Sequence, residues 1–157
     1  MRSVAAPKNA RRLAAGRSAL RGAKTFQPGS QPTVLIVDDD ASLLRSLGRL
    51  VSLAGYRVET FSQPSALLAS EIPTHNACML VDVLMPEMNG VELCEALTKS
   101  GRDLPAILIT GKSAEEIRPL IERSPAVEVL YKPVDEGPLL RAIERAVALS
   151  KTRTPRN

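Results

Sequence analysis

Short apolar runs and amphipathic segments alternate along the chain from Gln31 onward. The first run, Val34–Val37, is apolar without interruption, which is typical of a parallel strand that is covered on both faces. Taken together, the runs predict five strands, at Val34–Val37, Tyr56–Phe61, Ala77–Val81, Ala106–Ile109 and Val127–Tyr131.

Apolar residues at helical spacing occupy the intervals between these runs and the segment after the last one. The first helix is expected to end at Gly55, a natural C-terminal stop, and the last to begin near Asp135, a good N-cap. The segments concerned contain Leu43, Leu47, Leu50 or Val51, and Ala54; Leu67 and Leu68 after Pro64; about Val91 to Thr98; about Ala114 to Arg123; and Leu139, Leu140, Ile143 and Val147.

The fourth predicted helix combines a strong start with an internal break. Ser113 and Glu116 have the spacing of a capping box, which places the first helical residue at Ala114. Pro119 then removes a helical hydrogen bond and clashes with the preceding turn, at a cost of roughly 3 kcal/mol. Ser124–Pro125 ends the segment soon afterwards, so we expect this helix to open at low free energy.

Five strand–helix units predict an α/β fold with a doubly wound parallel sheet, because each parallel crossover needs a connection of this kind. In such sheets ligands bind outside the carboxyl ends of the strands, where the winding direction switches. The residues at the predicted strand ends are therefore the first candidates for function. They are Asp38, Asp39 and Asp40 after the first strand, Asp82 after the third, Thr110 after the fourth and Lys132 after the fifth.

Three consecutive aspartates after a buried strand need an explanation, since neighbouring carboxylates repel one another unless a cation or hydrogen-bond donors offset the repulsion. A hard-cation site is one explanation. The alternative is that one aspartate caps the following helix while the others face water, and Asp40 is the best placed to do so. Carboxylates, a hydroxyl and an ammonium at one rim are the groups that phosphoryl transfer requires.

Charge is distributed unevenly over the 157 residues, a length that fits one domain. Ten of the 21 basic residues lie in residues 1–32 and 151–157, and all 17 acidic residues lie between those segments, which leaves residues 33–150 with a net charge of −6. The overall pI of about 9.4 thus describes the ends of the chain. Nucleic-acid binding through these ends is one hypothesis, which salt-dependent binding with and without residues 1–32 would test.

The same division predicts the domain organisation. Residues 1–32 are expected to be a basic, disordered tail, although an over-extended start would look the same, and residues 151–157 a basic C-terminal tail. One folded unit, residues 33–150, is expected between them, and no DNA-binding output domain is expected. Cys78 and Cys94 lack metal or redox spacing, which indicates core thiols in a reducing, cytoplasmic compartment, and no apolar run approaches the length of a membrane span.

Four motifs occur in order, each at a predicted strand end: "VLIVDDD", "LVDVLMPEMNG", "ILITGK" and "LYKPV". Over about Thr33 to Leu149 the sequence therefore resembles the receiver domains of bacterial two-component response regulators. The resemblance implies a flavodoxin-like (βα)5 fold with strand order 2-1-3-4-5. It also implies a cis peptide bond between Lys132 and Pro133.

The resemblance assigns a role to each residue of the rim. Asp82 is the implied phosphoacceptor, and Thr110 and Lys132 are expected to contact the phosphoryl group. Mg²⁺, or Mn²⁺, is the implied cofactor. Its implied ligands are Asp38, Asp39, Asp82 and the backbone carbonyl of Leu84. Of the first two, Asp39 is expected to bind the metal ion more directly.

The implied partners are a histidine kinase or phosphotransfer protein and a downstream protein target. The target is expected to bind the fourth helix, fifth strand and fifth helix, and the chain is expected to act alone or within a phosphorelay. Mg²⁺-dependent self-phosphorylation from a small phosphodonor and slow self-dephosphorylation are further expectations.

Two other functions share parts of this pattern. A phosphohydrolase of the haloacid dehalogenase type also uses an aspartate after its first strand and a second one two residues later, which Asp38 and Asp40 satisfy formally. That class has no counterpart for "DVLMPEMNG". The other alternative is a degenerate receiver, in which Asp82 pairs with Lys132 and is never phosphorylated.

Overall fold

A single parallel sheet organises residues 31–153, the part of the chain that the computed structural model describes. Its strands are β1 (Thr33–Val37), β2 (Arg57–Phe61), β3 (Ala77–Asp82), β4 (Ala106–Thr110) and β5 (Glu128–Tyr131). They are ordered β2-β1-β3-β4-β5, and every neighbouring pair is parallel. This arrangement confirms the flavodoxin-like fold and the strand order that the sequence predicted.

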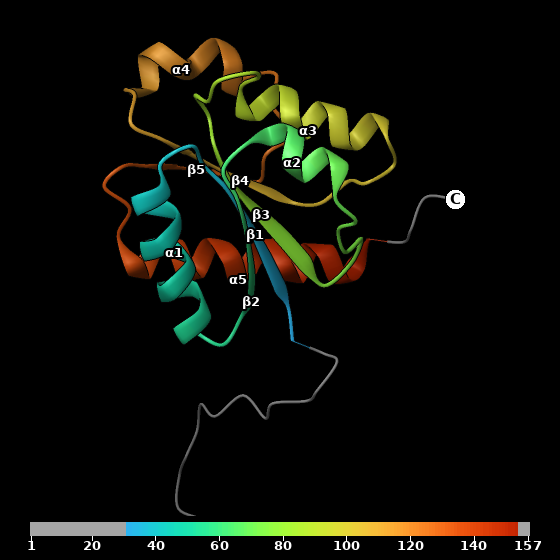
Figure 1. Ribbon diagram of the computed structural model, residues 1–157. Helices are drawn as coiled ribbons and strands as arrows, with labels where there is room; N and C mark the ends of the chain where they lie inside the picture. Colours follow the sequence, from blue (N-terminus) through green and yellow to red (C-terminus); the bar gives the residue numbers. More distant parts are fainter. Residues whose placement is uncertain (1–30, 154–157) are drawn as a thin grey trace, which may run out of the picture.

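Five helices cover the two faces of the sheet (Figure 1): α1 (Ala41–Leu53), α2 (Pro64–Ala69), α3 (Gly90–Lys99), α4 (Ala114–Ile121) and α5 (Glu136–Thr152). Helices α1 and α5 lie on one face, and α2, α3 and α4 lie on the other. The chain therefore winds in both directions from β1. Among the described residues, no helix combines the length and the apolar character that crossing a membrane would require.

Alternate residues of each central strand enter two separate cores. In β1, Val34 and Ile36 pack with α1 and α5, while Leu35 and Val37 pack with α2, α3 and α4. All five residues of this strand are buried, which explains why its sequence is continuously apolar rather than alternating.

Cys78 and Cys94 are also buried, and burial raises the pKa of both thiols to about 12.

Most of the predicted helix signals are confirmed. Asp40 caps α1 by accepting hydrogen bonds from the backbone N–H groups of Ser42 and Leu43. Ser113 and Glu116 form the expected capping box at the start of α4. Asn89 and Glu92 form a second capping box, which had not been predicted, at the start of α3.

Two helix ends and one helix cap differ from the prediction. Helix α4 ends at Ile121 rather than Arg123. Asp135 occupies the N-cap position of α5, but its side chain makes no capping hydrogen bond. Helix α5 continues to Thr152, so Lys151 and Thr152 are helical, whereas the sequence predicted a tail from residue 151. The rest of the two predicted tails, residues 1–30 and 154–157, lies outside the described residues.

A buried serine near the end of α5 holds the start of β3. Ser150 is 1% exposed, and its Oγ accepts a hydrogen bond from the Ala77 N–H at 3.2 Å. We expect Ser150→Ala to lower the free energy of unfolding by about 1–3 kcal/mol, because it leaves that buried N–H without its acceptor. Urea denaturation measures the loss. Ser52→Ala, on the exposed surface of α1, is the control and should change stability by less than about 0.5 kcal/mol.

Candidate functional site

Four strands deliver the candidate residues to one rim of the sheet. Asp38 follows the last residue of β1, Asp82 and Thr110 are the last residues of β3 and β4, and Lys132 follows β5. The strands β1, β3, β4 and β5 are consecutive neighbours and parallel, so their carboxyl ends lie side by side. The structure therefore brings together residues that are up to 94 positions apart in the sequence.

Lys132 bridges two buried carboxylates. Its Nζ lies 3.1 Å from Asp38 Oδ2 and 3.4 Å from Asp82 Oδ1. Asp38 is only 2% exposed and Asp82 only 7%. Burying two like charges this close together is costly unless a cation accompanies them, and the Lys132 ammonium supplies part of that compensation. The peptide bond between Lys132 and Pro133 is cis, as expected.

The three consecutive aspartates differ in environment. Asp40 is exposed and caps α1. Asp38 is buried, and besides its contact with Lys132 its Oδ1 accepts a hydrogen bond from the Asp40 N–H at 2.8 Å. Asp39 is exposed, and its carboxylate has no hydrogen bond or ion pair within the described part of the chain. The predicted cap is thus confirmed for Asp40, and carboxylate oxygens of Asp38 and Asp39 lie near each other at the rim, where a hard-cation site stays a prediction.

Three carboxylates of this rim have the donor chemistry of a divalent-cation site. One ligand oxygen each from Asp38, Asp39 and Asp82 lies within 4.8 Å of the other two. Oxygen-only sites of this kind suit Mg²⁺ and Mn²⁺. The next loop begins with Val83 and Leu84, and within the described residues the Leu84 carbonyl accepts no hydrogen bond. The residues present therefore fit the expected cation.

The electrostatics of the rim favour the arrival of further positive charge. Burial, and then the nearby Asp38 carboxylate, raise the pKa of Asp82, and Lys132 only partly opposes this rise. For Lys132, burial acts to lower the pKa, but its contacts with Asp38 and Asp82 outweigh that effect and raise it. The ammonium thus stays protonated, while the carboxylates still lack full compensation.

Thr110 is positioned to donate a hydrogen bond at the same rim. Its side chain is 1% exposed, and its Oγ1 accepts a hydrogen bond from the Lys112 N–H at 3.0 Å. A hydroxyl that accepts one hydrogen bond still has its own proton to donate. The strand ends at Thr110 and Lys132 are directly linked, since the Lys132 N–H donates to the Thr110 carbonyl at 2.7 Å.

The loop between β3 and α3 is pressed against the end of β3. The Gly90 N–H donates to the Val83 carbonyl at 2.8 Å. A Cβ atom at position 90 would lie 2.4 Å from the backbone oxygen of Asp82. Only glycine allows this approach, so Gly90 helps to fix the position of Asp82.

One part of the site was missed from the sequence. A cavity of about 230 Å³ beside Asp39 is lined by the start of α2 and by the β3–α3 loop; its lining residues are Asp39, Ser62, Gln63, Pro64, Pro86 and Glu87. Ser65 Oγ connects these two segments by donating to the Glu87 carboxylate at 3.3 Å. Residues 62–64 line this cavity only because β2 lies beside β1 in the sheet. The local sequence around residues 62–64 does not indicate that pairing.

Comparison with known proteins agrees with this geometry. Residues 34–144 match the family model described as response regulator receiver domain. The chain is 33% identical over 120 residues to the response regulator protein TmoT of Ectopseudomonas mendocina, covering 76% of this chain and 54% of TmoT. It is 32% identical over 114 residues to the transcriptional regulatory protein FixJ of Rhizobium meliloti (strain 1021), covering 73% of this chain and 56% of FixJ.

A solved structure extends the match to three dimensions. The crystal structure of FixJ-N superimposes with a TM-score of 0.69 at 31% identity, covering 78% of this chain and 96% of that one. The chain spans about half the length of the curated relatives it matches, because the match is confined to one portion of each. From the fold, the rim and these matches it follows that this chain belongs to the family of response regulator receiver domains.

Proposed function

We propose that the chain accepts a phosphoryl group on Asp82 from the phosphohistidine of a histidine kinase or phosphotransfer protein. The observation that supports this most directly is the buried pair of carboxylates, Asp38 and Asp82, bridged by Lys132 beside an exposed third carboxylate. Signalling then proceeds through contacts with a protein target, or the phosphoryl group passes along a phosphorelay.

The transfer is a displacement at phosphorus. An Asp82 carboxylate oxygen forms the new P–O bond as the P–N bond to the donor imidazole breaks, and the imidazole nitrogen keeps the electron pair and takes a proton. Lys132 and Thr110 donate hydrogen bonds to the phosphoryl oxygens, and this stabilises their charge. Asp38, Asp39, Asp82 and the Leu84 carbonyl hold Mg²⁺ or Mn²⁺, which when bound supplies positive charge for the phosphoryl oxygens.

Labelling with a small phosphodonor tests the proposal. The chain, incubated with an acyl phosphate and Mg²⁺, should gain a single phosphoryl group whose linkage is labile to acid and to base, as expected of an acyl phosphate on a carboxylate. Intact-protein mass spectrometry measures the gain. Continuous hydrolysis of small phosphate monoesters without a lasting label would favour a phosphohydrolase, and an absence of label would favour a degenerate receiver.

Mg²⁺ should stabilise the folded chain against heat. A ligand at one hundred times its dissociation constant adds about 2.7 kcal/mol when it binds only the folded state. Because three carboxylates lie within 4.8 Å of one another, the gain should depend on them. Differential scanning calorimetry with and without Mg²⁺ measures it. Asp39→Asn should remove most of the response, and Glu71→Gln, at an exposed position without an ion pair in the described part of the chain, should keep it. A melting temperature that does not change with Mg²⁺ would contradict the site.

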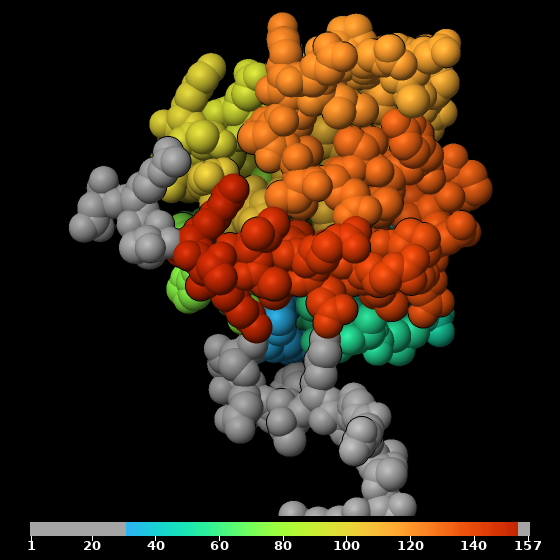
Figure 2. Space-filling model, turned by 180° about the vertical axis from the view of Figure 1, so that it is seen from behind, coloured from blue at the N-terminus to red at the C-terminus, as the bar shows by residue number. Residues whose placement is uncertain are grey.

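The proposed target-binding surface consists of α4, β5 and α5. These elements form one continuous face in Figure 2, where α4 and β5 are orange and α5 is red. Tyr131 of β5 exposes 45% of its surface, and Val127, immediately before β5, exposes 37%. Exposed apolar groups of this kind are typical of protein-binding surfaces.

Helix α4 should respond to phosphorylation of Asp82. Only Ile117 is buried in this helix, and Pro119 lies inside it, so little holds it in place. We expect amide exchange across residues 114–121 to change by about tenfold or more on phosphorylation, which corresponds to about 1.4 kcal/mol. Exchange in α3, which buries five of its residues, is the internal reference. Equal and strong protection of α4 in both states would make it a rigid scaffold.

On this proposal the receiver unit spans residues 33–150, between a basic segment of residues 1–32 and another of residues 151–157. It works in the cytoplasm, where a kinase and its target are both accessible. The net charge of −6 on residues 33–150 supports a protein rather than a nucleic acid as the partner of the folded unit.

A further inference from the structure

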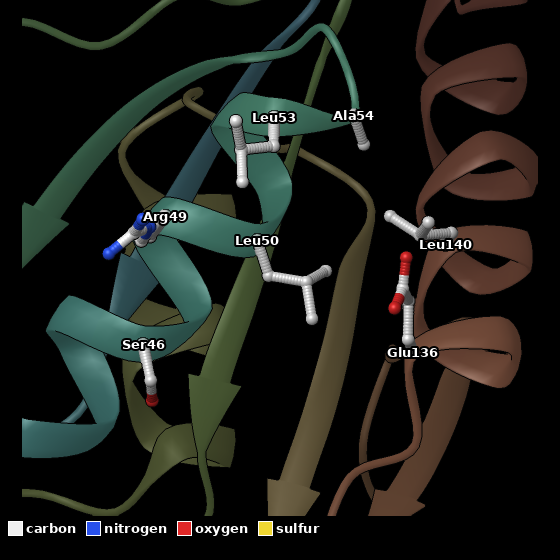
Figure 3. Close-up of a pocket in the computed structure, with 7 residues that line it drawn as sticks. All are labelled: Ser46, Arg49, Leu50, Leu53, Ala54, Glu136 and Leu140. Carbon is white, nitrogen blue, oxygen red and sulfur yellow. The ribbon is translucent and has the colours of Figure 1, made fainter.

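A groove with apolar walls runs between α1 and α5. It has a volume of about 480 Å³, and Leu50, Leu53 and Ala54 of α1 face Leu140 of α5 across it. Figure 3 shows the side chains of Leu50 and Leu140 in the space between the two helices. Leu53 is 79% exposed, which is the largest exposure among the large apolar residues that the structure describes. A segment that covered this groove would therefore gain free energy from apolar burial.

The charge at the groove favours a basic occupant. Glu136 lies on the α5 side, with its carboxylate directed along the gap, whereas the Arg49 side chain points away from α5 (Figure 3). Neither residue has an ion pair within the described part of the chain. The groove thus presents one available carboxylate beside an apolar surface.

The described part of the chain begins with Gln31 at the edge of this groove. Gln31 Nε2 donates a hydrogen bond to the Gly55 carbonyl at 3.0 Å, and Gly55 directly follows the wall residue Ala54. The Arg57 N–H donates to the Pro32 carbonyl at 2.9 Å and fixes the next residue as well. Phe26 is five residues before Gln31. An extended chain spans at most about 3.3–3.6 Å per residue, so Phe26 can reach any point within roughly 16–18 Å of this anchor.

The composition of this portion matches the groove. Residues 20–30 contain two large apolar residues, Leu20 and Phe26, together with the basic residues Arg21 and Lys24. Residues 1–32 contain no acid, so nothing in them would repel the carboxylate of Glu136. The reach of residues 20–30, their two large apolar side chains and their positive charge all favour this segment as the occupant of the groove.

We propose that residues 20–30 bind in the groove between α1 and α5, with the Phe26 ring against Leu50, Leu53 and Leu140. Lys24 or Arg21 then lies beside Glu136. The segment is an intramolecular ligand of the receiver unit, and it excludes any protein that would use the same groove. Tethering at Gln31 gives it a high effective concentration, so a weak contact is enough to keep it bound.

Disulfide trapping in the full chain tests this contact while Phe26 and the groove leucines stay intact. Thr25→Cys is combined either with Ser46→Cys, which lines the groove, or with Ser52→Cys, which does not. Both serines are exposed on α1, and Ser52 is closer to the anchor at Gly55. The native thiols do not interfere, since both are buried and burial raises their pKa to about 12.

Under mild oxidation, the Ser46 pair should form an intramolecular disulfide about tenfold faster than the Ser52 pair, a ratio in line with burial of one aromatic side chain. Adding Phe26→Ala to the Ser46 pair should remove that advantage. Equal rates, a faster Ser52 pair or no effect of Phe26→Ala would overturn the proposal, because a tether without a bound state favours the nearer cysteine. Disulfide-linked dimers whose yield rises with protein concentration would instead identify a second copy as the occupant.

Discussion

Asp82→Asn is expected to abolish phosphoryl labelling of the chain completely. The carboxamide has nearly the same shape as the carboxylate but is not a nucleophile, so the P–O bond cannot form. The fold should survive, because Lys132 keeps its contact with Asp38 at 3.1 Å and one buried negative charge is removed. Intact-protein mass spectrometry after incubation with an acyl phosphate and Mg²⁺ measures the loss.

Two matched variants separate the acceptor from its surroundings. Asp38→Asn and Asp39→Asn remove a carboxylate from the same cluster while leaving Asp82 in place. They should slow labelling by weakening cation binding, but a label should still accumulate on Asp82. Label that persists in Asp82→Asn would contradict the assignment of Asp82 as the acceptor. A melting temperature that falls by more than that of Asp39→Asn would contradict the expected survival of the fold and would attribute the loss of label to unfolding.

Gly90→Ala is expected to have the second-largest effect, on both stability and labelling. The added Cβ would lie 2.4 Å from the backbone oxygen of Asp82 and 3.0 Å from Val81 Cγ1. Both neighbours belong to the central strand β3, so relief of the clash must displace the end of that strand or the start of α3. Overpacking of this kind costs about 1–3 kcal/mol. A displacement of Asp82 by about 1 Å can slow its reaction by up to roughly a hundredfold.

Gly48→Ala is the control for this substitution. Gly48 lies inside α1, and a Cβ there would meet Thr60 Cγ2 at 3.6 Å, an ordinary contact distance. Alanine is favoured over glycine in a helix by about 0.5–1 kcal/mol, so this variant should be slightly more stable and should be labelled at the normal rate. Chemical denaturation and labelling rates distinguish the two variants. Equal behaviour would show that the β3–α3 loop adjusts without moving Asp82.

The buried strands and the winding of the sheet could be predicted from local pattern. A continuous apolar run such as Val34–Val37 has few structural solutions apart from a strand covered on both faces. The helix starts were predictable for a similar reason, because the Ser113–Glu116 box and the Asp40 cap satisfy backbone groups within a few residues. Asp135 shows the limit, since it has the right position and makes no capping hydrogen bond.

The candidate site was predictable as a set of residues at one rim, because parallel strands place their carboxyl ends together. Its internal geometry was not. Nothing near Asp38 or Asp39 in the sequence shows that the first is 2% exposed and the second exposed. The position of the Lys132 ammonium between two carboxylates depends on β5 reaching the same rim as β1 and β3.

The sequence by itself thus determined the type of each element, the doubly wound sheet and the chemical groups at its rim. Tertiary structure decided which groups touch: Lys132 with Asp38 and Asp82, Ser150 with the start of β3, and Gln31 with the end of α1 beside the groove. The physical reason is that local pattern reflects backbone conformation and the burial of one face. A contact between side chains 50 or 94 residues apart arises only when strand order and helix packing are combined.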